Sequence, residues 1–538
     1  MLSSLLSNPT RSLAAVLALS SSLGVNAYDL EPDNVDNIKS ISKDMAADMM
    51  NFYADAMVAG APGDLHTPYY WWEAGALMMV LIDYWKLTGD TTYNNDVMAA
   101  LMHQTGKYND YMPDNQTLTE GNDDQGFWGM AVMSAAELGF ENPEEGKPGW
   151  LALAQAVFNT QAARWDTQHC NGGLRWQIFT WNNGYDYKNT ISQGCFFNLA
   201  ARLALYTGNS SYADWAEKTY DWVMSKKYID RHYNVYDGAY ISTDCTTLTP
   251  YQWTYNNGVF MLGLSAMYNM TGDDKWKQEL DSMINGSKIF FRGPDDNIMT
   301  EVACETVNKC NYDQQSFKAY LSRWMAATTK WAPYTSDMIM PYLRATSIAA
   351  ASQCVGGTNG RLCGLKWYTG KYDGTSGLGM QMAALEAVLT NLIGEQPAFL
   401  TANSGGTSKG DAGAGGDDVR LNPNYKVPVS TGSKVGAVFL TLFIIAGLIS
   451  SLIWMLKDET ISLLSFFSLS GFMRALHADL PSGVEGNGSD AAIYTDKAPS
   501  PVAVQAKTSA GTVARGSLTS ESPIQGPPPT HVTGRAGA

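Results

Sequence analysis

The chain has 538 residues, with 36 Lys and Arg side chains against 52 Asp and Glu side chains, which gives a formal net charge of −16 at pH 7. This acidic balance argues against a nucleic-acid-binding protein, because phosphate binding needs a basic surface. Aromatic residues form 11% of the chain. Trp and Tyr fill cores and also stack on sugar rings, so they fit a large domain and only hint at a glycan site.

Residues 1–27 have the pattern of a secretory signal peptide. Arg11 precedes a short apolar run, 13–19, and a small-x-small cleavage site ends at Ala27. We therefore expect a mature chain that starts at Tyr28 and passes through an oxidising compartment, where disulfides form. The same route permits N-glycosylation at surface sequons. These are Asn115, Asn209, Asn269 and Asn285.

Seven cysteines predict three disulfides and one free thiol, although sequence alone does not prove connectivity. Cys195 lies in the apolar stretch "GCFFNLAARLA", and we predict that it is the buried free thiol. The predicted pairs are Cys170–Cys245, Cys304–Cys310 and Cys354–Cys363. The chain has six histidines and neither a C-x-x-C nor an H-E-x-x-H pattern, so no zinc site and no cofactor are expected.

Composition divides the chain behind the signal peptide into four parts. Residues 28–399 are expected to form one large domain. Residues 400–434 are rich in Gly, Ser, Thr and Asp, and predict a flexible linker that cannot bury a core. Residues 435–456 are uncharged and long enough, at about 1.5 Å per residue, to cross a bilayer core. Residues 457–538 are predicted to be a low-complexity, disordered tail.

The apolar span predicts a single-pass membrane protein whose large domain lies outside the cell. A lipid-anchor signal is the alternative, but such a signal ends the chain, and here residues 457–538 follow the span. The apolar stretch that starts at Ile461 is unusual for a cytosolic tail. Two explanations for this stretch therefore stay open: an interfacial helix, or a segment that the mature protein lacks.

The large domain repeats a helix-turn-helix unit. Apolar runs end in Thr-Gly-Asp or Thr-Gly-Asn turns that begin at Thr88, Thr207 and Thr271, with a related Leu138-Gly139 between them. Glycine after an apolar run ends a helix, and Asp or Asn then starts the next one. About six such pairs, without runs of alternating strands, predict an all-α fold. This is an (α/α)6 toroid with apolar inner helices and amphipathic outer helices.

Each apolar run opens with polar and aromatic residues, as in "PYYWWEAGALMM", "GNDDQGFWGM" and "YQWTYNNGVFM". In a ring of helical hairpins the same ends of the inner helices meet at one mouth, so these residues are predicted to face one bowl. They are Trp72, Glu73, Asp123, Asp124, Asn189, Gln193, Trp253, Tyr255 and Asn256. Helix capping is the alternative. Capping explains one acid at a helix start, but not a doubled acid with Trp.

Asp123 and Asp124 are the strongest candidates for catalysis. A neighbouring like charge raises the pKa of one carboxyl, so a pair can divide into acid and base. Adjacent helical residues place their carboxyls nearer to the ~5–5.5 Å of retaining glycosidases than to the ~6.5–9.5 Å of inverting ones. A calcium loop is the other use of clustered acids, but its D-x-D-x-D-G-x5-E pattern is absent.

Six sequence blocks occur in order: "GNDDQGFWGMAVMSAAE", "NGGLRWQ", "YKNTISQGCFFNLAARLA", "VYDGA", "TYNNGVF" and "DQQSFKAYLSRWM". Together they resemble glycoside hydrolase family 76, and in particular the fungal cell-wall branch of its endo-α-1,6-mannosidases. The resemblance extends from Tyr28 to about Gly394. It implies an α/α toroid, a signal peptide and a membrane anchor.

The resemblance also implies roles for individual residues. Asp123 would be the nucleophile and Asp124 the general acid/base. The substrate-binding residues would be Asp237, Asp313, Tyr255, Asn256, Asn189, Trp128 and Trp72, with Trp176 and Lys188 as weaker candidates. For Trp128, a sugar platform and a core position carry equal weight.

The function implied by the resemblance is that of a retaining endo-α-1,6-mannosidase or mannan transglycosidase at the cell surface. Its substrate would be α-1,6-mannan or a lipid-anchor glycan. A role in linking glycosylphosphatidylinositol-type glycoproteins to wall glucan would make that glucan an acceptor. Hydrolysis and transfer stay open. The alternative is a non-catalytic mannan-binding surface protein, which the intact Asp-Asp pair disfavours. Many fungal members are described as lipid-anchored, whereas this chain has a predicted span.

Overall fold

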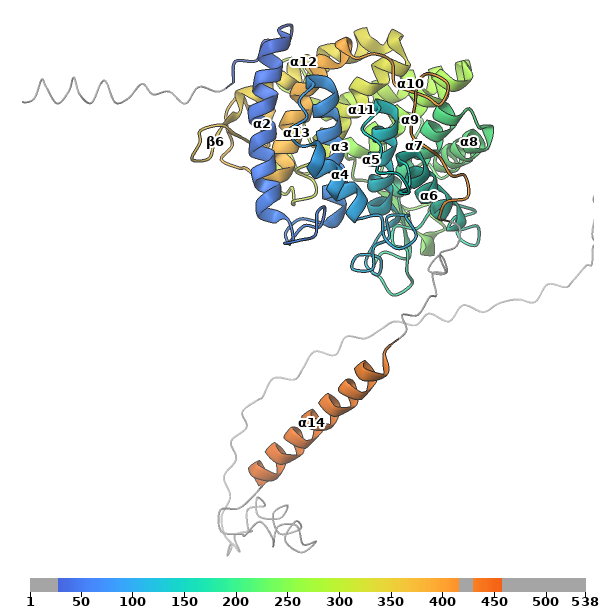
Figure 1. Cartoon of the computed structure of the whole chain (residues 1–538), viewed down its shortest axis with the longest axis vertical. Helices are drawn as coiled ribbons and strands as arrows, with labels where there is room; N and C mark the ends of the chain where they lie inside the picture. Colours follow the sequence, from blue (N-terminus) through green and yellow to red (C-terminus); the bar gives the residue numbers. More distant parts are fainter. Residues whose placement is uncertain (1–27, 416–428, 457–538) are drawn as a thin grey trace, which may run out of the picture. The chain divides into compact units, whose positions relative to one another are not determined.

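The computed structural model describes residues 28–415 and 429–456 (Figure 1). The chain divides into two units, Met1–Pro428 and Val429–Ala538. In the second unit the described part is one helix, α14 (Thr431–Leu456). The predicted signal peptide, residues 416–428 of the predicted linker and the predicted tail lie outside the described residues.

Twelve α-helices between residues 28 and 415 form a double ring, as the sequence predicted (Figure 1). Each inner helix contacts the next inner helix, and the last contacts the first, which closes the ring. The inner helices are α3 (Trp71–Thr88), α5 (Asn122–Leu138), α7 (Thr190–Thr207), α9 (Thr254–Thr271), α11 (Phe317–Trp331) and α13 (Leu378–Leu389). The outer helices are α2 (Val35–Ala56), α4 (Asn94–His103), α6 (Trp150–Ala163), α8 (Ser210–Ser225), α10 (Asp274–Gly286) and α12 (Ser336–Ser352). The (α/α)6 toroid is therefore confirmed.

The glycine turns end the inner helices where the sequence predicted. Gly89, Gly208 and Gly272 have φ angles of +78°, +70° and +65°, a left-handed conformation that glycine adopts without strain. Asn209 and Asp273 then cap the next outer helix through their side chains. All three turns return the chain from the inner ring to the outer ring.

Burial separates the two rings. Almost every residue of α5 and α7 is buried, whereas α8 and α10 bury only one face. A helix enclosed by neighbours is apolar all round, and a surface helix is amphipathic. The inner helices therefore form the core of the domain.

Short strands and 3-10 turns occupy the connections between helices. The antiparallel sheet β1-β2-β3 consists of β1 (Tyr187–Asn189), β2 (Gly238–Tyr240) and β3 (Leu248–Thr249), with Tyr187 opposite Tyr240. Two further antiparallel pairs are β4 (Phe291–Arg292) with β5 (Ile298–Met299), and β6 (Cys354–Gly356) with β7 (Leu362–Cys363). The 3-10 turns are η1 (Ile241–Thr243), η2 (Ser287–Phe290), η3 (Glu305–Val307), η4 (Pro333–Thr335), η5 (Trp367–Thr369) and η6 (Thr390–Glu395).

The cysteines are arranged as predicted. The three disulfides are Cys170–Cys245, Cys304–Cys310 and Cys354–Cys363. Cys195 is a free, buried thiol on α7. The first disulfide joins the loop before β1 to the segment that follows η1, so it fastens two sides of the β1-β2-β3 sheet. The four predicted glycosylation sites are all exposed, whereas their modification stays a prediction.

The prediction of a flexible linker from residue 400 onward is wrong for residues 400–415, which pack against the toroid. The backbone N–H of Leu400 donates to the carbonyl of Glu137 (2.8 Å), and that of Ala402 donates to the carbonyl of Tyr206 (2.9 Å). Farther on, Asn159 Nδ2 donates to the carbonyls of Ala412 and Ala414 (2.9 Å each). The segment is therefore part of the domain.

Glycine makes this packing possible instead of preventing it. A Cβ atom on Gly406 would lie 2.2 Å from the Tyr206 hydroxyl, and one on Gly410 would lie 2.7 Å from Gln155 Oε1. Composition predicted flexibility because the segment has few apolar side chains. It docks through backbone groups, which composition does not report.

Helix α14 agrees with the predicted span in place and character. The most apolar 18-residue window within Thr431–Met455 has a mean hydropathy of 2.4, and none of that window is buried inside the protein. Its length and composition are sufficient to cross a membrane.

Candidate active site

A central cavity of about 480 Å³ opens where the inner helices begin. Its walls come from the first turns of α3, α5, α9 and α11 and from the connections that precede the inner helices. The lining residues are Tyr70, Trp72, Thr119, Asp123, Asp124, Phe127, Trp176, Gln177, Tyr187, Asn189, Asp237, Trp253, Tyr255, Asp313, Gln314 and Phe317. The sequence thus correctly predicted that the heads of the inner helices meet in one bowl.

Asp123 and Asp124 lie in the first turn of α5 and have different partners. Asn189 Nδ2, from the head of α7, donates to Asp123 Oδ2 (2.7 Å). The backbone N–H of Asp124 donates to Asp123 Oδ1 (3.1 Å). Asp124 Oδ2 instead accepts from the backbone N–H of Gly121 (2.6 Å), the residue that precedes α5. Among the residues that the structure describes, donors therefore reach both oxygens of Asp123 but one oxygen of Asp124.

These surroundings separate the acidities of the two carboxyls. Burial raises the pKa of Asp123 to about 7, although the hydrogen bond from Asn189 acts in the opposite direction. Burial, and then the neighbouring Asp123 charge, raise the pKa of Asp124 well above its usual value. The first of the two to ionise is therefore Asp123, while Asp124 keeps its proton. This division suits a nucleophile beside a general acid.

Two more carboxyls stand in the cavity wall. Asp237 accepts hydrogen bonds from the Tyr187 hydroxyl (2.7 Å) and from Trp253 Nε1 (2.8 Å), so it joins two aromatic side chains. Burial raises the pKa of Asp237, and it raises the pKa of Asp313 to about 6. Within the described residues, Asp313 Oδ1 is buried without a hydrogen-bond partner. Asp313 is thus the wall carboxyl with an oxygen left for a ligand.

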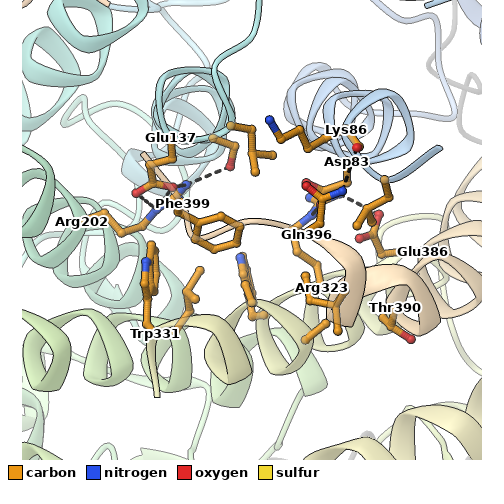
Figure 2. Close-up of a pocket in the computed structure, with 18 residues that line it drawn as sticks. Asp83, Lys86, Glu137, Arg202, Arg323, Trp331, Glu386, Thr390, Gln396 and Phe399 are labelled. Carbon is orange, nitrogen blue, oxygen red and sulfur yellow. Dashed lines mark hydrogen bonds and ion pairs between the residues drawn. The ribbon is translucent and has the colours of Figure 1, made fainter. Parts of the chain in front are cut away.

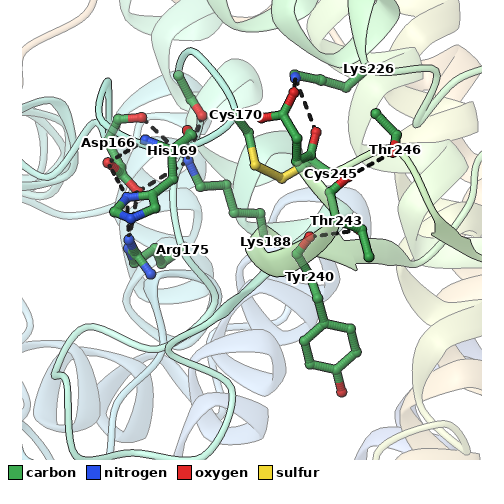
Figure 3. Close-up of a disulfide and its surroundings, with 12 residues drawn as sticks. Asp166, His169, Cys170, Arg175, Lys188, Lys226, Tyr240, Thr243, Cys245 and Thr246 are labelled. Carbon is green, nitrogen blue, oxygen red and sulfur yellow. Dashed lines mark hydrogen bonds and ion pairs between the residues drawn. A yellow bond between two sulfur atoms is a disulfide. The ribbon is translucent and has the colours of Figure 1, made fainter. Parts of the chain in front are cut away.

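Lys188 supports this wall from behind (Figure 3). Its ammonium donates to the carbonyls of Asp166 (3.3 Å), His169 (2.8 Å) and Gly172 (2.6 Å), and it lies 3.3 Å from Asp166 Oδ2. Successive strand side chains point to opposite faces. Tyr187 and Asn189 therefore face the cavity, and Lys188 fastens strand β1 to the 166–172 loop.

Most predicted site residues line the cavity, but Trp128 and Asn256 do not. Trp128 is fully buried and stacks between Trp71 and Tyr111, with ring centroids 5.2 and 5.4 Å away. It is therefore a core residue. Asn256 is 1% exposed and also lies outside the lining. Each comes one position after a lining residue, Phe127 or Tyr255, and one position turns a helix by about 100°.

Three other candidates have supporting positions. Glu73 Oε2 accepts from the backbone N–H of Tyr70 (2.7 Å) and so caps α3. Gln193 bonds both the N–H and the carbonyl of Leu174. Lys188 is buried behind the wall. For Glu73 and Gln193 the capping and structural interpretation holds, whereas Trp176 lines the cavity.

Sequence reasoning missed several wall residues. Tyr187 directly precedes Lys188 in a quoted block, and alternation along a strand could have placed it on the same face as Asn189. Gln177 ends the block "NGGLRWQ". Tyr70 and Phe317 lie at the starts of α3 and α11, and the aromatic residues at the helix starts, which predicted the bowl, could have identified them.

A second cavity lies at the opposite end of the inner ring and is unsuited to a glycan (Figure 2). Its volume is about 40 Å³, little more than the space for a water molecule or two. Charged pairs fill it: Arg202 Nη2 lies 2.6 Å from Glu137, and Arg323 bonds both Asp83 and Glu386. Among the described residues, no group of three or more His, Cys, Asp or Glu side chains is arranged to hold a metal ion.

The sequence profile described as glycosyl hydrolase family 76 matches residues 37–403. The chain is 46% identical over 434 residues to the mannan endo-1,6-alpha-mannosidase DCW1 of Saccharomyces cerevisiae, covering 80% of this chain and 95% of that protein. It is 44% identical to the mannan endo-1,6-alpha-mannosidase DFG5 of the same yeast, covering 80% of this chain and 94% of that protein.

Solved structures share the fold. The crystal structure of Dfg5 from Chaetomium thermophilum in complex with glucosamine is 46% identical, with a TM-score of 0.69, and covers 72% of this chain and 97% of that one. An inactive variant of the α-1,6-mannanase GH76A of Salegentibacter sp. HEL1_6, in complex with α-1,6-mannotriose, has a TM-score of 0.53. It is 17% identical and covers 66% of this chain and 99% of that one, so it shows the toroid alone. With the profile matched across the whole double ring and these relatives above 40% identity, the chain belongs to glycosyl hydrolase family 76 and is a glycoside hydrolase.

Proposed function

We propose that the toroid is a retaining endo-α-1,6-mannosidase, or a transglycosidase that shares its first step. The observation that carries this proposal is the Asp123–Asp124 pair, whose two carboxyls lie in one cavity with unlike partners. The names of the yeast relatives support α-1,6-linked mannose as the substrate class.

In the first step Asp124 donates its proton to the glycosidic oxygen while Asp123 attacks the anomeric carbon. The C–O bond to the leaving sugar breaks, and a covalent mannosyl-Asp123 ester forms. The Asn189 hydrogen bond holds Asp123 in one orientation and favours its ionised form. The positive ends of the inner helices also favour negative charge in this cavity.

In the second step the Asp124 carboxylate removes a proton from the incoming hydroxyl. That oxygen attacks the anomeric carbon, the ester bond breaks, and Asp123 is released. Water gives hydrolysis and a sugar hydroxyl gives transfer. If the reaction is a transfer, the proposed acceptor is wall glucan. The product would then be a lipid-anchored glycoprotein linked to that glucan. A non-catalytic mannan-binding protein would need neither an acid nor a nucleophile at this position.

The proposed location is the cell surface, reached through the secretory pathway, with the toroid outside the membrane. The exposed apolar surface of α14 supports an anchor in the membrane. The predicted signal peptide supports the same route. The proposed partners are therefore a mannan or lipid-anchor glycan and a membrane, without nucleic acid.

Substitution of each aspartate tests the assignment. Asp123→Asn is expected to lower kcat on an α-1,6-mannooligosaccharide by about 10⁴-fold or more. Asp124→Asn is expected to be similarly slow on that substrate, but to retain cleavage of a dinitrophenyl mannoside, whose leaving group needs no proton. Asp55→Asn, at an exposed position on α2, is the control. Wild-type turnover by the Asp123→Asn variant would overturn the nucleophile assignment.

A further inference from the structure

Exposed aromatic side chains of the toroid gather at one end. Within residues 28–415, the exposed Tyr and Trp side chains lie in connections that lead into the inner helices, with the exception of Tyr334 in η4. Those at the cavity end are Tyr70, Trp176, Trp181, Tyr240, Tyr251 and Tyr312. The solvent-exposed aromatic surface is thus concentrated around the mouth of the central cavity.

Two of these rings extend the cavity wall outward. Tyr240 lies opposite Tyr187 in the β1-β2 ladder, with ring centroids 4.8 Å apart. Tyr251 lies beside Trp253, with centroids 5.9 Å apart. Tyr187 and Trp253 both line the cavity and both donate to Asp237. Tyr240 and Tyr251 therefore stand one ring beyond the wall, on either side of that carboxylate.

The backbone at Tyr240 is held in place although its side chain is 50% exposed. The N–H of Cys245 donates to the Tyr240 carbonyl (3.2 Å), and the Cys170–Cys245 disulfide lies behind it. Figure 3 shows the Tyr240 ring projecting away from that disulfide. Tyr251 is 56% exposed. A fixed, exposed ring is ready to bind without the entropy cost of ordering.

The neighbours of these rings suit a ligand rich in hydroxyl groups. Ser242, Thr243, Asp244, Thr246 and Thr247 are all exposed in the turn between Tyr240 and β3. The apolar surface is therefore interrupted by exposed hydroxyls and by the Asp244–Lys226 ion pair, unlike the contiguous apolar patch that marks a protein-docking site. Sugar rings present C–H groups to aromatic faces and hydroxyls to such polar neighbours.

We propose that Tyr240 and Tyr251 bind sugar residues of the glycan chain that lie outside the central cavity. This inference rests on the proposed function and adds a chain-length preference to it. The cavity volume of about 480 Å³ is in the range of pockets that enclose a single small ligand. Further residues of a polymer must therefore lie on the rim, and these two rings continue the wall there.

The test compares a short and a long substrate. For α-1,6-linked mannobiose and mannohexaose, the ratio of kcat/KM, long over short, is measured in the wild type and in the double variant Tyr240→Ala, Tyr251→Ala. Loss of the two stacking contacts is expected to lower this ratio by roughly threefold to tenfold. The variant Tyr240→Phe, Tyr251→Phe keeps the rings and should restore it. Tyr334→Ala removes an exposed ring at the other end of the toroid and should not change it.

The outcomes separate this inference from the proposed function. An active wild type whose ratio is the same in the double alanine variant overturns the role of the rim and leaves the function standing. A change in oligomeric state on light scattering, without a change in the ratio, assigns the rings to a protein interface and also overturns it.

If the wild type cleaves neither oligosaccharide, the proposed function fails and calorimetry decides the role of the rim. Both oligosaccharides are then titrated into the Asp123→Asn variant, with and without the two alanine substitutions. Weaker binding of mannohexaose alone supports the rim site. Equal binding, or no binding, overturns it.

Discussion

Asn189 donates a hydrogen bond of 2.7 Å from Nδ2 to Asp123 Oδ2, and it also caps the inner helix that follows the one bearing Asp123. The orientation and the acidity of one side chain in the Asp123–Asp124 pair thus depend on a residue 66 positions later in the chain. The bond favours the ionised form of Asp123, so its removal has a defined effect on pH dependence.

Asn189→Ser should shift the acidic limb of the kcat/KM profile to higher pH. Serine keeps a side-chain oxygen for the helix cap, but is too short to reach Asp123. The Asn189 hydrogen bond opposes the rise in the Asp123 pKa that burial causes. Without it the pKa rises further, and Asp123 ionises at higher pH. A profile whose acidic limb does not move, with the fold intact by circular dichroism, would contradict the role of Asn189.

Lys188→Met should destabilise the domain by about 1–3 kcal/mol, because it leaves the carbonyls of Asp166, His169 and Gly172 without this donor, whereas the Asp166 carboxylate keeps its pair with Arg175. It should also lower kcat, since β1 carries Asn189. Urea unfolding and steady-state kinetics measure the two effects. Lys275→Met is the matched control, because Lys275 pairs with Glu217 at the surface, where a pair contributes about 1 kcal/mol or less. Equal losses in both variants would refute the proposed support.

Glu301→Gln should reduce the loss of stability that accompanies a rise in pH from about 4.5 to 8. Glu301 is buried and accepts from the N–H of Thr254 (3.1 Å). Burial raises its pKa to about 8, above the ordinary value of 4.5. The folded state thus holds a proton that the unfolded state has released, and the free energy of unfolding falls as pH rises from 4.5 to 8. Glutamine does not ionise and can still accept from Thr254.

Melting temperatures between pH 5 and pH 8.5 check this expectation. The wild type should lose more stability over this range than the Glu301→Gln variant. Glu217→Gln, at the surface, should follow the wild-type curve. A Glu301→Gln curve parallel to the wild type would show that Glu301 is already ionised in the folded protein.

Detergent, and not a phosphatidylinositol-specific phospholipase, should release the full-length protein from membranes. The apolar surface of α14 is exposed along its length, and a span of this kind holds without a lipid. An epitope tag placed in residues 457–538 reports whether the tail is still attached to the protein. Release by the phospholipase with loss of that epitope would identify the C-terminal region as an attachment signal.

The ring was predictable because its signals are local. Gly89, Gly208 and Gly272 follow apolar runs, and each adopts the left-handed conformation that ends a helix. The aspartate pair was predictable for the same reason, since it stands at the head of one inner helix. The direction in which each side chain points was harder to predict from the sequence. Phe127 faces the cavity and Trp128 the core, although the two residues are adjacent in the chain.

Contacts between segments that are far apart in the chain could not be predicted from the sequence. Nothing near Lys188 indicates that it fastens the 166–172 loop instead of binding sugar. The Gly-rich segment 400–415 predicted a linker, because it docks mainly through its own backbone groups, which bond α5, α6 and α7. The rim position of Tyr240 depends likewise on its pairing with Tyr187 across the sheet.

The anomeric configuration of the first product tests the central claim most directly. Two adjacent aspartates at one helix start are expected to hold their carboxyls nearer to the ~5–5.5 Å of retaining enzymes than to the ~6.5–9.5 Å of inverting ones, so the reaction should pass through an ester on Asp123 and invert the anomeric carbon twice. Proton NMR of α-1,6-mannohexaose cleavage, followed before mutarotation, should show the α-anomer first. A β-anomer that appears first would contradict the account and reassign Asp123 as the base that activates a water.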